Sequence, residues 1–144
     1  MVIFKVIALS SLVMTLSTIS NASEFKIQFD WSGLKLCTSG QPNLVSNPQF
    51  VISGLPKGTE YVQFKLVDRD VPGYNHGGGT VKISADGKVP SDAFKYKSPC
   101  PPNGSHKYQW TATAKNKKGW GAKKLGIAKA CLLYTSPSPR DVEE

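Results

Sequence analysis

Two short polar clusters hold the residues of this sequence that could do chemistry. The first, residues 68–79, begins with Asp68-Arg69-Asp70-Val71-Pro72 and ends with a histidine followed by three glycines. The second, residues 98–108, combines three prolines with the other histidine of the chain. Each cluster adjoins a strand-like run. We therefore expect folding to bring the clusters together as two walls of one ligand site.

The side chains of these clusters are suited to binding an anion. His76 and His106 could donate hydrogen bonds to an oxyanion. Asp68 and Asp70 lie two residues apart, so they face the same side of an extended strand. We expect Asp70 to orient or charge one imidazole. We expect Asp68 mainly to hold the 77–79 loop, because aspartate readily accepts hydrogen bonds from loop N–H groups.

Two other kinds of chemistry receive less support from the spacing of these residues. Two histidines and an aspartate could ligate zinc, but no close His-x-His or Cys-x-x-Cys spacing accompanies them, so we expect no metal. No serine lies in a Gly-x-Ser-x-Gly elbow, so nucleophilic catalysis is not expected. We predict a non-enzymatic protein without a cofactor, and a hydrolase using the Asp and His side chains stays open as an alternative.

The two clusters also resemble the signature motifs of a known family, the phosphatidylethanolamine-binding proteins, which include Raf kinase inhibitor protein. The closer resemblance is to the short exported bacterial branch. Residues 68–72 match the family's Asp-Pro-Asp-x-Pro motif, with Arg69 in place of the first proline. Residues 98–108 match Gly-Pro-x-Pro-Pro-x-Gly-x-His-Arg-Tyr, with Ser98 for the glycine and Lys107 for the arginine. Lysine cannot make the planar, bidentate contacts of arginine.

This resemblance implies a fold and a ligand class. The fold would be an antiparallel β-sandwich with a small anion pocket at one end. The ligand would be a phosphate-type head group, either of a phospholipid or of a phosphorylated small molecule. Because relatives inhibit enzymes, an inhibitor of a kinase or a protease is the main alternative. Carried over to this sequence, the ligand-binding candidates are Asp68, Asp70, His76, His106 and Tyr108.

Hydrophobic periodicity independently indicates an all-β fold. Apolar and polar residues alternate over 25–31, 61–67 and 108–114, which is typical of half-buried strands. Shorter apolar runs occur at 50–52, 81–83, 94–96 and 125–128. An Asp-Gly pair within 85–88 suggests a hairpin turn. Short strands joined by Pro/Gly-rich loops predict an antiparallel, Greek-key-like β-sandwich.

The charge of the chain favours anionic partners. Lys and Arg total 18 against 10 Asp and Glu, a net charge of +8. Phospholipid head groups, phosphorylated ligands and polyanions all fit this balance, and peripheral contact with an anionic membrane is a further expectation. The lysines between residues 115 and 124 are either a solvated hairpin or a polyanion-binding surface. No specific nucleic-acid partner is expected, and the oligomeric state stays open.

The first residues and the cysteines point to export. Residues 1–22 have a short positive start, an apolar run and small residues at the end, as a signal peptide does. We expect a periplasmic or secreted protein. Cys37 and Cys100 would then form a disulfide in an oxidising compartment. Such a bond would tether the 38–48 loop to the proline-rich loop and brace one wall of the pocket.

The last residues have a different pattern. Residues 131–141 show no periodicity and match one reading frame of the transposon-end adapter used in sequencing libraries. We therefore expect the native domain to span residues 23–130, and residues 131–144 to be adapter read-through with a coil conformation and no part in the core. The native sequence would continue the last strand beyond Ala130.

Overall fold

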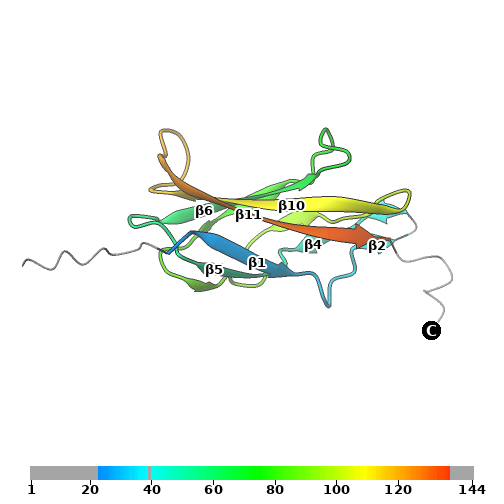
Figure 1. The fold of residues 1–144 in the computed structure, drawn as a ribbon, viewed down its shortest axis with the longest axis horizontal. Helices are drawn as coiled ribbons and strands as arrows, with labels where there is room; N and C mark the ends of the chain where they lie inside the picture. The colour runs from blue at the N-terminus through cyan, green and yellow to red at the C-terminus, as the bar shows by residue number, and fades with distance from the viewer. Residues whose placement is uncertain (1–22, 39, 137–144) are drawn as a thin grey trace, which may run out of the picture.

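The computed structural model describes residues 23–38 and 40–136, and these residues form an antiparallel β-sandwich (Figure 1). The predicted all-β fold is therefore confirmed. None of the described residues belongs to a helix long and apolar enough to cross a bilayer. The predicted signal peptide lies outside the described residues.

The larger sheet carries the longest strands. Its order is β11-β10-β6-β7, with every neighbouring pair antiparallel. The strands are β6 (Tyr61–Asp68), β7 (Gly78–Lys82), β10 (Ser105–Lys115) and β11 (Lys124–Thr135). The alternation predicted for β6 and β10 is present, because every second side chain of each strand is buried. Period-two alternation thus placed both strands correctly.

The opposing sheet is smaller and is completed by short strand pairs. It has the order β1-β5-β8, formed by β1 (Lys26–Asp30), β5 (Gln49–Ser53) and β8 (Gly87–Lys88). Two further pairs are β2 (Cys37–Thr38) with β3 (Gln41–Pro42), and β4 (Leu44–Ser46) with β9 (Lys95–Lys97). Residues 38–48 were expected to be loop. Beyond Thr38, they contain two short strands, β3 and β4.

Aromatic side chains fill the space between the sheets. Phe50 of the small sheet stacks on Phe64 of β6 with ring centroids 4.6 Å apart, and it meets Trp110 of β10 edge-on at 5.1 Å. Tyr96 of β9 packs edge-on against Trp110 at 4.8 Å. All four are essentially inaccessible to solvent. The inward positions of β10 that follow Trp110 are alanines, whose small size leaves room for this cluster.

Two expectations about local structure are wrong. The Asp-Gly pair does not close a hairpin, because the strand after it, β8, pairs with β5 rather than with β7. Asp86 instead accepts hydrogen bonds from the backbone N–H groups of Gly54 and Leu55, both at 2.9 Å. This aspartate braces a neighbouring turn while the chain crosses from one sheet to the other.

The second wrong expectation concerns residues 131–135, which are not coil. They extend β11 and pair with β10 as far as Thr135 opposite Ser105. Tyr134 packs against the core, with its ring centroid 5.9 Å from that of Trp31. A coil was expected because the segment lacks periodicity, but the backbone of β10 offers hydrogen bonds to any extended partner. Whether residues 131–144 are native stays a prediction.

The glycines after His76 serve packing. A Cβ on Gly78 would overlap the backbone of Phe64, and the φ of Gly78 is +156°. A Cβ on Gly79 would overlap the ring of Phe94. Only glycine lets β7 lie this close to its neighbours. These two residues therefore form the start of a strand rather than part of the site.

A candidate ligand-binding pocket

The two polar clusters meet at one end of the sandwich, around a pocket of about 260 Å³. The first cluster begins at the last residue of β6 and the second runs into the start of β10, and these strands are antiparallel neighbours, so the clusters lie side by side. Three of the five predicted residues line the pocket: Asp68, His76 and Tyr108. The other lining residues are Gly40, Gln41, Pro42, Val71, Tyr74, Cys100 and Pro102.

Asp68 ends β6 as a buried carboxylate that is 4% exposed. Its Oδ1 accepts hydrogen bonds from the backbone N–H groups of Asp70 at 2.9 Å and Val71 at 3.1 Å, which caps the turn. Its Oδ2 lies 2.7 Å from Nδ1 of His106. Burial raises the pKa of the carboxyl, but the three hydrogen bonds outweigh burial and hold the pKa below its ordinary value. Asp68 is therefore an anion whose charge is already well solvated by the protein.

His76 is held rigidly against β9 and is also 4% exposed. Its backbone carbonyl accepts a hydrogen bond from the N–H of Lys97 at 2.8 Å, and its Nδ1 donates to the Lys97 carbonyl at 2.7 Å. Because a carbonyl only accepts, the proton of neutral His76 is on Nδ1 and Nε2 carries the lone pair. Within residues 23–38 and 40–136, Nε2 makes no hydrogen bond. Burial lowers the pKa of this imidazole, so it is neutral at pH 7.

Neither aspartate has the role expected of it. Asp68, not Asp70, contacts an imidazole. Asp70 is exposed, and its Oδ2 accepts a hydrogen bond from the backbone N–H of Lys107 at 2.7 Å. The 77–79 loop is held by Asn75, whose Oδ1 accepts from the N–H of Gly77 at 2.9 Å. The expected role of Asp68 at that loop is therefore wrong.

His106 and Asp70 are not among the residues that line the pocket. His106 reaches the pocket through Asp68, because its Nδ1–H donates to the carboxylate that lines it. Whether both histidines contact one ligand stays a prediction. His106 supports the site by holding a pocket residue in place, and Asp70 supports it by tying the turn to β10.

Aromatic rings form the remaining wall. Tyr108 is buried, with its ring centroid 5.5 Å from that of His76. Burial, followed by the neighbouring Asp68 carboxylate, raises the pKa of the Tyr108 phenol, so its hydroxyl keeps its proton at neutral pH. Tyr74 lies edge-on to His76 at 4.6 Å and is 41% exposed. The ammonium of Lys97 lies 5.7 Å from the centre of the Tyr74 ring, which places a positive charge beside the pocket.

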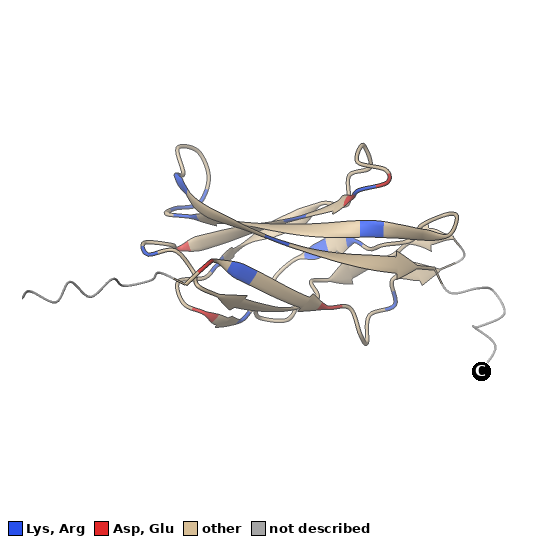
Figure 2. Cartoon of the chain, in the orientation of Figure 1, with Lys and Arg blue, Asp and Glu red and all other residues tan. Residues whose placement is uncertain are grey.

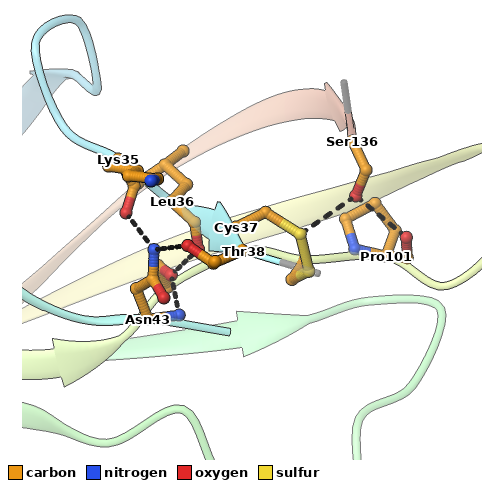
Figure 3. The surroundings of a disulfide bond; sticks show 9 residues. Lys35, Leu36, Cys37, Thr38, Asn43, Pro101 and Ser136 are labelled. Atoms are coloured by element: carbon orange, nitrogen blue, oxygen red, sulfur yellow. Dashed lines mark hydrogen bonds between the residues drawn. A yellow bond between two sulfur atoms is a disulfide. The ribbon is translucent and has the colours of Figure 1, made fainter. Parts of the chain in front are cut away.

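The predicted disulfide is present and braces the opposite wall (Figure 3). Cys37 and Cys100 have Cα atoms 5.2 Å apart. Asn43 reinforces the loop after Cys37, because its side-chain amide donates to the Lys35 carbonyl at 2.8 Å and to Thr38 Oγ1 at 2.9 Å. The bond ties this loop to the proline-rich segment, as expected. The loop in turn supplies three lining residues, 40–42.

Ser98 anchors the proline-rich segment where the family motif has glycine. Its side chain is fully buried, and its Oγ accepts a hydrogen bond from the N–H of Asn43 at 3.0 Å and donates to the Leu36 carbonyl. Its own N–H donates to the Asn43 carbonyl at 2.9 Å. This substitution therefore adds contacts between the two walls. Lys107 contributes to the site through its backbone. Its carbonyl accepts a hydrogen bond from the N–H of Arg69, and its N–H donates to Oδ2 of Asp70.

A zinc site built from both histidines does not form. Among the described residues, the group whose donor atoms could hold a metal is Asp68, Asp70 and His106, with those atoms within 4.8 Å of one another. His76 is not part of this group. Each of the three side chains already makes a hydrogen bond to another protein group. The expectation of no metal stays a prediction.

Sequence reasoning missed two pocket residues that offer polar or aromatic contacts. Gln41 lies in the 38–48 loop and Tyr74 lies in the first cluster, and the sequence analysis singled out neither residue as a ligand contact. The predicted disulfide was the available signal for Gln41, because it predicted that this loop forms a wall. The aromatic residue two positions before His76 was the signal for Tyr74.

Comparison with known proteins supports the fold. No protein-family model and no curated protein matches the sequence. A structure titled as a putative phosphatidylethanolamine-binding protein homologue from Chlamydia trachomatis is similar, with a TM-score of 0.57 and 14% identity over 79% of this chain and 99% of that chain. Escherichia coli YbcL, described as a new member of the mammalian phosphatidylethanolamine-binding protein family, has a TM-score of 0.56 and 17% identity over 80% of this chain and 100% of that chain. The resemblance expected from the two motifs is thus confirmed at the level of the fold.

Proposed function

We propose that this chain is a non-enzymatic binding protein whose pocket takes a phosphate-type anionic head group. The observation that carries the proposal is the convergence of Asp68, His76 and Tyr108 on one pocket, where Nε2 of His76 makes no hydrogen bond to another of the described residues. The names of the two similar structures refer to phosphatidylethanolamine binding in those proteins. These names make phosphatidylethanolamine head groups the first ligands to test on this chain.

The size of the pocket favours a head group over a whole lipid. Pockets for drug-sized ligands usually have volumes of roughly 300–1,000 Å³. A volume of about 260 Å³ lies just below that range. It therefore suits a phosphoethanolamine-sized group, with any acyl chains of the ligand outside the pocket.

The charges around the pocket are compatible with an anion that also carries a proton or an ammonium group. Asp68 repels an anion less than a free carboxylate would, because three donors already surround it. Neutral His76 accepts a hydrogen bond from a monoanionic phosphate, and protonated His76 donates one. The exposed ring of Tyr74 offers a face to an ammonium group.

The composition of the pocket lining supports binding rather than covalent chemistry. No serine, lysine or free thiol lines the pocket among the described residues, since the Cys100 sulfur is in the disulfide. The disulfide also supports the proposal that the protein is exported to an oxidising compartment. The compartment would be the periplasm or the extracellular space.

Calorimetry with phosphate and phosphoethanolamine tests the proposal. We expect the His76→Ala variant to bind roughly 10- to 150-fold more weakly, because a hydrogen bond to a charged group contributes about 1.5–3 kcal/mol. His106→Ala should lose less, since His106 contacts Asp68 and not the pocket. Affinity should rise only as the pH falls through the pKa of His76, which burial lowers below its ordinary value of 6.5, because the protonated imidazole can donate to the anion.

Two controls separate this function from the alternatives. A Lys117/Lys118/Lys123/Lys124→Gln variant should keep phosphoethanolamine affinity, and a loss there would indicate a polyanion-binding surface instead. Hydrolysis of a phosphate ester by the parent, abolished in His76→Ala, would indicate an enzyme. Equal affinity of the parent and His76→Ala would contradict the pocket proposal, and inhibition of a kinase or protease by both proteins would then favour the inhibitor alternative.

A further inference from the structure

The tip of the β10–β11 hairpin, residues 116–123, is the most unusual surface of the molecule. Trp120 at its apex is 98% exposed, so almost none of this large apolar side chain contacts the protein. Trp31 and Trp110, in contrast, are buried in the core. A tryptophan that folding leaves almost wholly exposed indicates a partner that buries it.

Five lysines surround this tryptophan. They are Lys115, Lys117, Lys118, Lys123 and Lys124, and all but Lys115 are exposed. Figure 2 shows the basic residues of the hairpin at one end of the long sheet. Among the described residues, none of the five lies within salt-bridge distance of a carboxylate. The tip therefore carries uncompensated positive charge around an apolar apex.

The hairpin holds this arrangement in a defined conformation. The N–H of Asn116 donates to the Lys123 carbonyl at 3.2 Å, and Oδ1 of Asn116 accepts from the N–H of Lys123 at 2.8 Å. Gly119 and Gly121, on either side of Trp120, have φ values of +81° and +72°. These left-handed positions turn the backbone at the apex and present the indole outward. The conformation thus exists before any partner binds.

We propose that the hairpin tip docks the protein on the surface of an anionic lipid bilayer. Tryptophan is the side chain that favours the membrane interface most clearly, because its ring is apolar and its N–H is polar. Lysines adjacent to it lay their stems along the interface and place their ammonium groups at lipid phosphates. The occupant is therefore the lipid surface itself, recognised by its negative charge and its apolar interior.

A nucleic acid fits the same surface less well. Single-stranded nucleic acids bind in grooves where several aromatic rings stack on successive bases. The hairpin tip is convex and offers one aromatic ring, and its cations are lysines without the arginine fork that reads phosphates and bases. A nucleic acid and an anionic bilayer both complement the positive charge of the hairpin tip. The convex shape of the tip favours the flat surface of the bilayer.

Docking through this tip has a consequence for the pocket. Tyr108 and Lys115 lie at opposite ends of the β6–β10 pairing, roughly 24 Å apart along the strand. In Figure 1 the hairpin lies at the left end of the molecule and β2, beside the pocket, at the right end. A protein docked by the hairpin would hold its pocket away from that bilayer. The pocket would then sample ligands in solution.

Vesicle binding tests this proposal, using residues 23–144, which include every strand that the structure describes. The probes are vesicles of phosphatidylcholine alone and of phosphatidylcholine with about 30% phosphatidylglycerol, an anionic content that attracts polybasic segments. We expect co-sedimentation with the anionic vesicles only, and a blue shift of Trp fluorescence that is absent in Trp120→Phe. Raising the salt from about 50 to about 500 mM should weaken binding strongly.

Two charge-matched variants decide the location of the surface. Lys117/Lys118/Lys123/Lys124→Gln should weaken partitioning roughly 100-fold or more, since each lysine near an anionic surface contributes substantially. Lys35/Lys65/Lys88/Lys95→Gln removes the same charge from exposed positions elsewhere and should weaken it at most about 10-fold through the general field. Trp120→Ala should weaken it roughly 10-fold through loss of interfacial burial.

Three results would overturn the proposal. One is equal binding to the neutral and anionic vesicles. Another is an equal loss in the two charge-matched variants, which would assign binding to net charge alone. The third is binding of a single-stranded oligonucleotide that quenches Trp120 while the anionic vesicles stay unbound, which would make nucleic acid the partner. None of these results depends on whether the pocket binds phosphoethanolamine.

Discussion

The two ends of the sandwich use polar residues in opposite ways. At the pocket end, Asp68 and His76 are buried and almost every polar atom they carry is hydrogen-bonded to the protein. At the hairpin end, lysines and Trp120 are exposed and their side chains make almost no contact with the protein. The two ends share one strand, β10, which pairs with β6 beside the pocket and with β11 at the hairpin. The function proposed for the first end would depend on geometry, and the function proposed for the second would depend on charge and exposure.

This difference predicts how mutations will act. A change at the pocket end alters stability and binding together, because the groups that form the site also hold the loops. A change at the hairpin end should alter binding to a partner and leave stability almost unchanged, because exposed side chains without contacts contribute little. The predictions below use this contrast and are ordered from the largest expected effect to the smallest.

Removing the disulfide should have the largest effect. Cys37 and Cys100 are separated by 63 positions, and closing a loop of that length stabilises a protein by about 4 kcal/mol in the chain-entropy model. We expect Cys37/Cys100→Ser to lower the melting temperature by roughly 15 °C. Calorimetric melting measures this loss. Cys131→Ser is the control and should melt like the parent, because Cys131 is a free, exposed thiol. A double variant as stable as the parent would show that the pocket end does not need its cross-link.

Removing residues 131–144 should destabilise the protein by roughly 2–3 kcal/mol, through the loss of β-ladder pairs and of Tyr134 from the core. A tail with no part in the core would leave stability unchanged, but β11 runs to Thr135 and Ser136 Oγ donates to the Pro101 carbonyl at 3.0 Å. Urea unfolding measures the loss. Tyr134→Ala should reproduce part of it and Tyr134→Phe none. A truncated protein as stable as the parent would restore the view that these residues lie outside the domain.

The two aspartates should differ in what their charge contributes. Asp68→Asn keeps an oxygen for the turn but removes the charged partner of His106, so we expect a loss of roughly 2 kcal/mol. Asp70→Asn, at an exposed position, should cost less than about 0.5 kcal/mol. Parallel urea titrations of the two variants compare them directly. A larger loss of stability in Asp70→Asn than in Asp68→Asn would contradict the structure, in which Asp68 is buried and Asp70 is exposed.

The smallest effect concerns acid. Burial lowers the folded-state pKa of His76 below the unfolded value of 6.5. The neutral imidazole therefore contributes stability that is present above pH 6.5 and is lost as the pH falls through the lowered folded-state pKa. We expect the melting temperature to start falling below pH 6.5 in the parent and to fall less in His76→Gln over the same range. An identical fall in both proteins would show that His76 is not the titrating group. The lowered pKa of Asp68 adds a separate loss only below pH 3.8.

Several features of this protein followed from local sequence alone. Alternation over β6 and β10 is a property of each strand, so the pattern predicted which of their side chains are buried. The two cysteines, in a chain expected to be exported, predicted their bond, and the two motifs predicted the fold and the end of the sandwich that holds the pocket. Each of these inferences needs only the residues themselves and their immediate neighbours.

Other features depend on partners that are distant in sequence. Asp68 and Asp70 look equivalent in the chain, and only the register of β6 against β10 places Asp68 beside His106 and Asp70 beside the backbone of Lys107. The tautomer of His76 is set by the carbonyl of Lys97, 21 positions away. Residues 131–135 become a strand because β10 provides the hydrogen bonds that their own pattern does not predict. Local pattern determined the strands with regular alternation, such as β6 and β10. Long-range pairing determined the remaining strands and which side chain contacts which, because a hydrogen-bond partner is chosen by position in space.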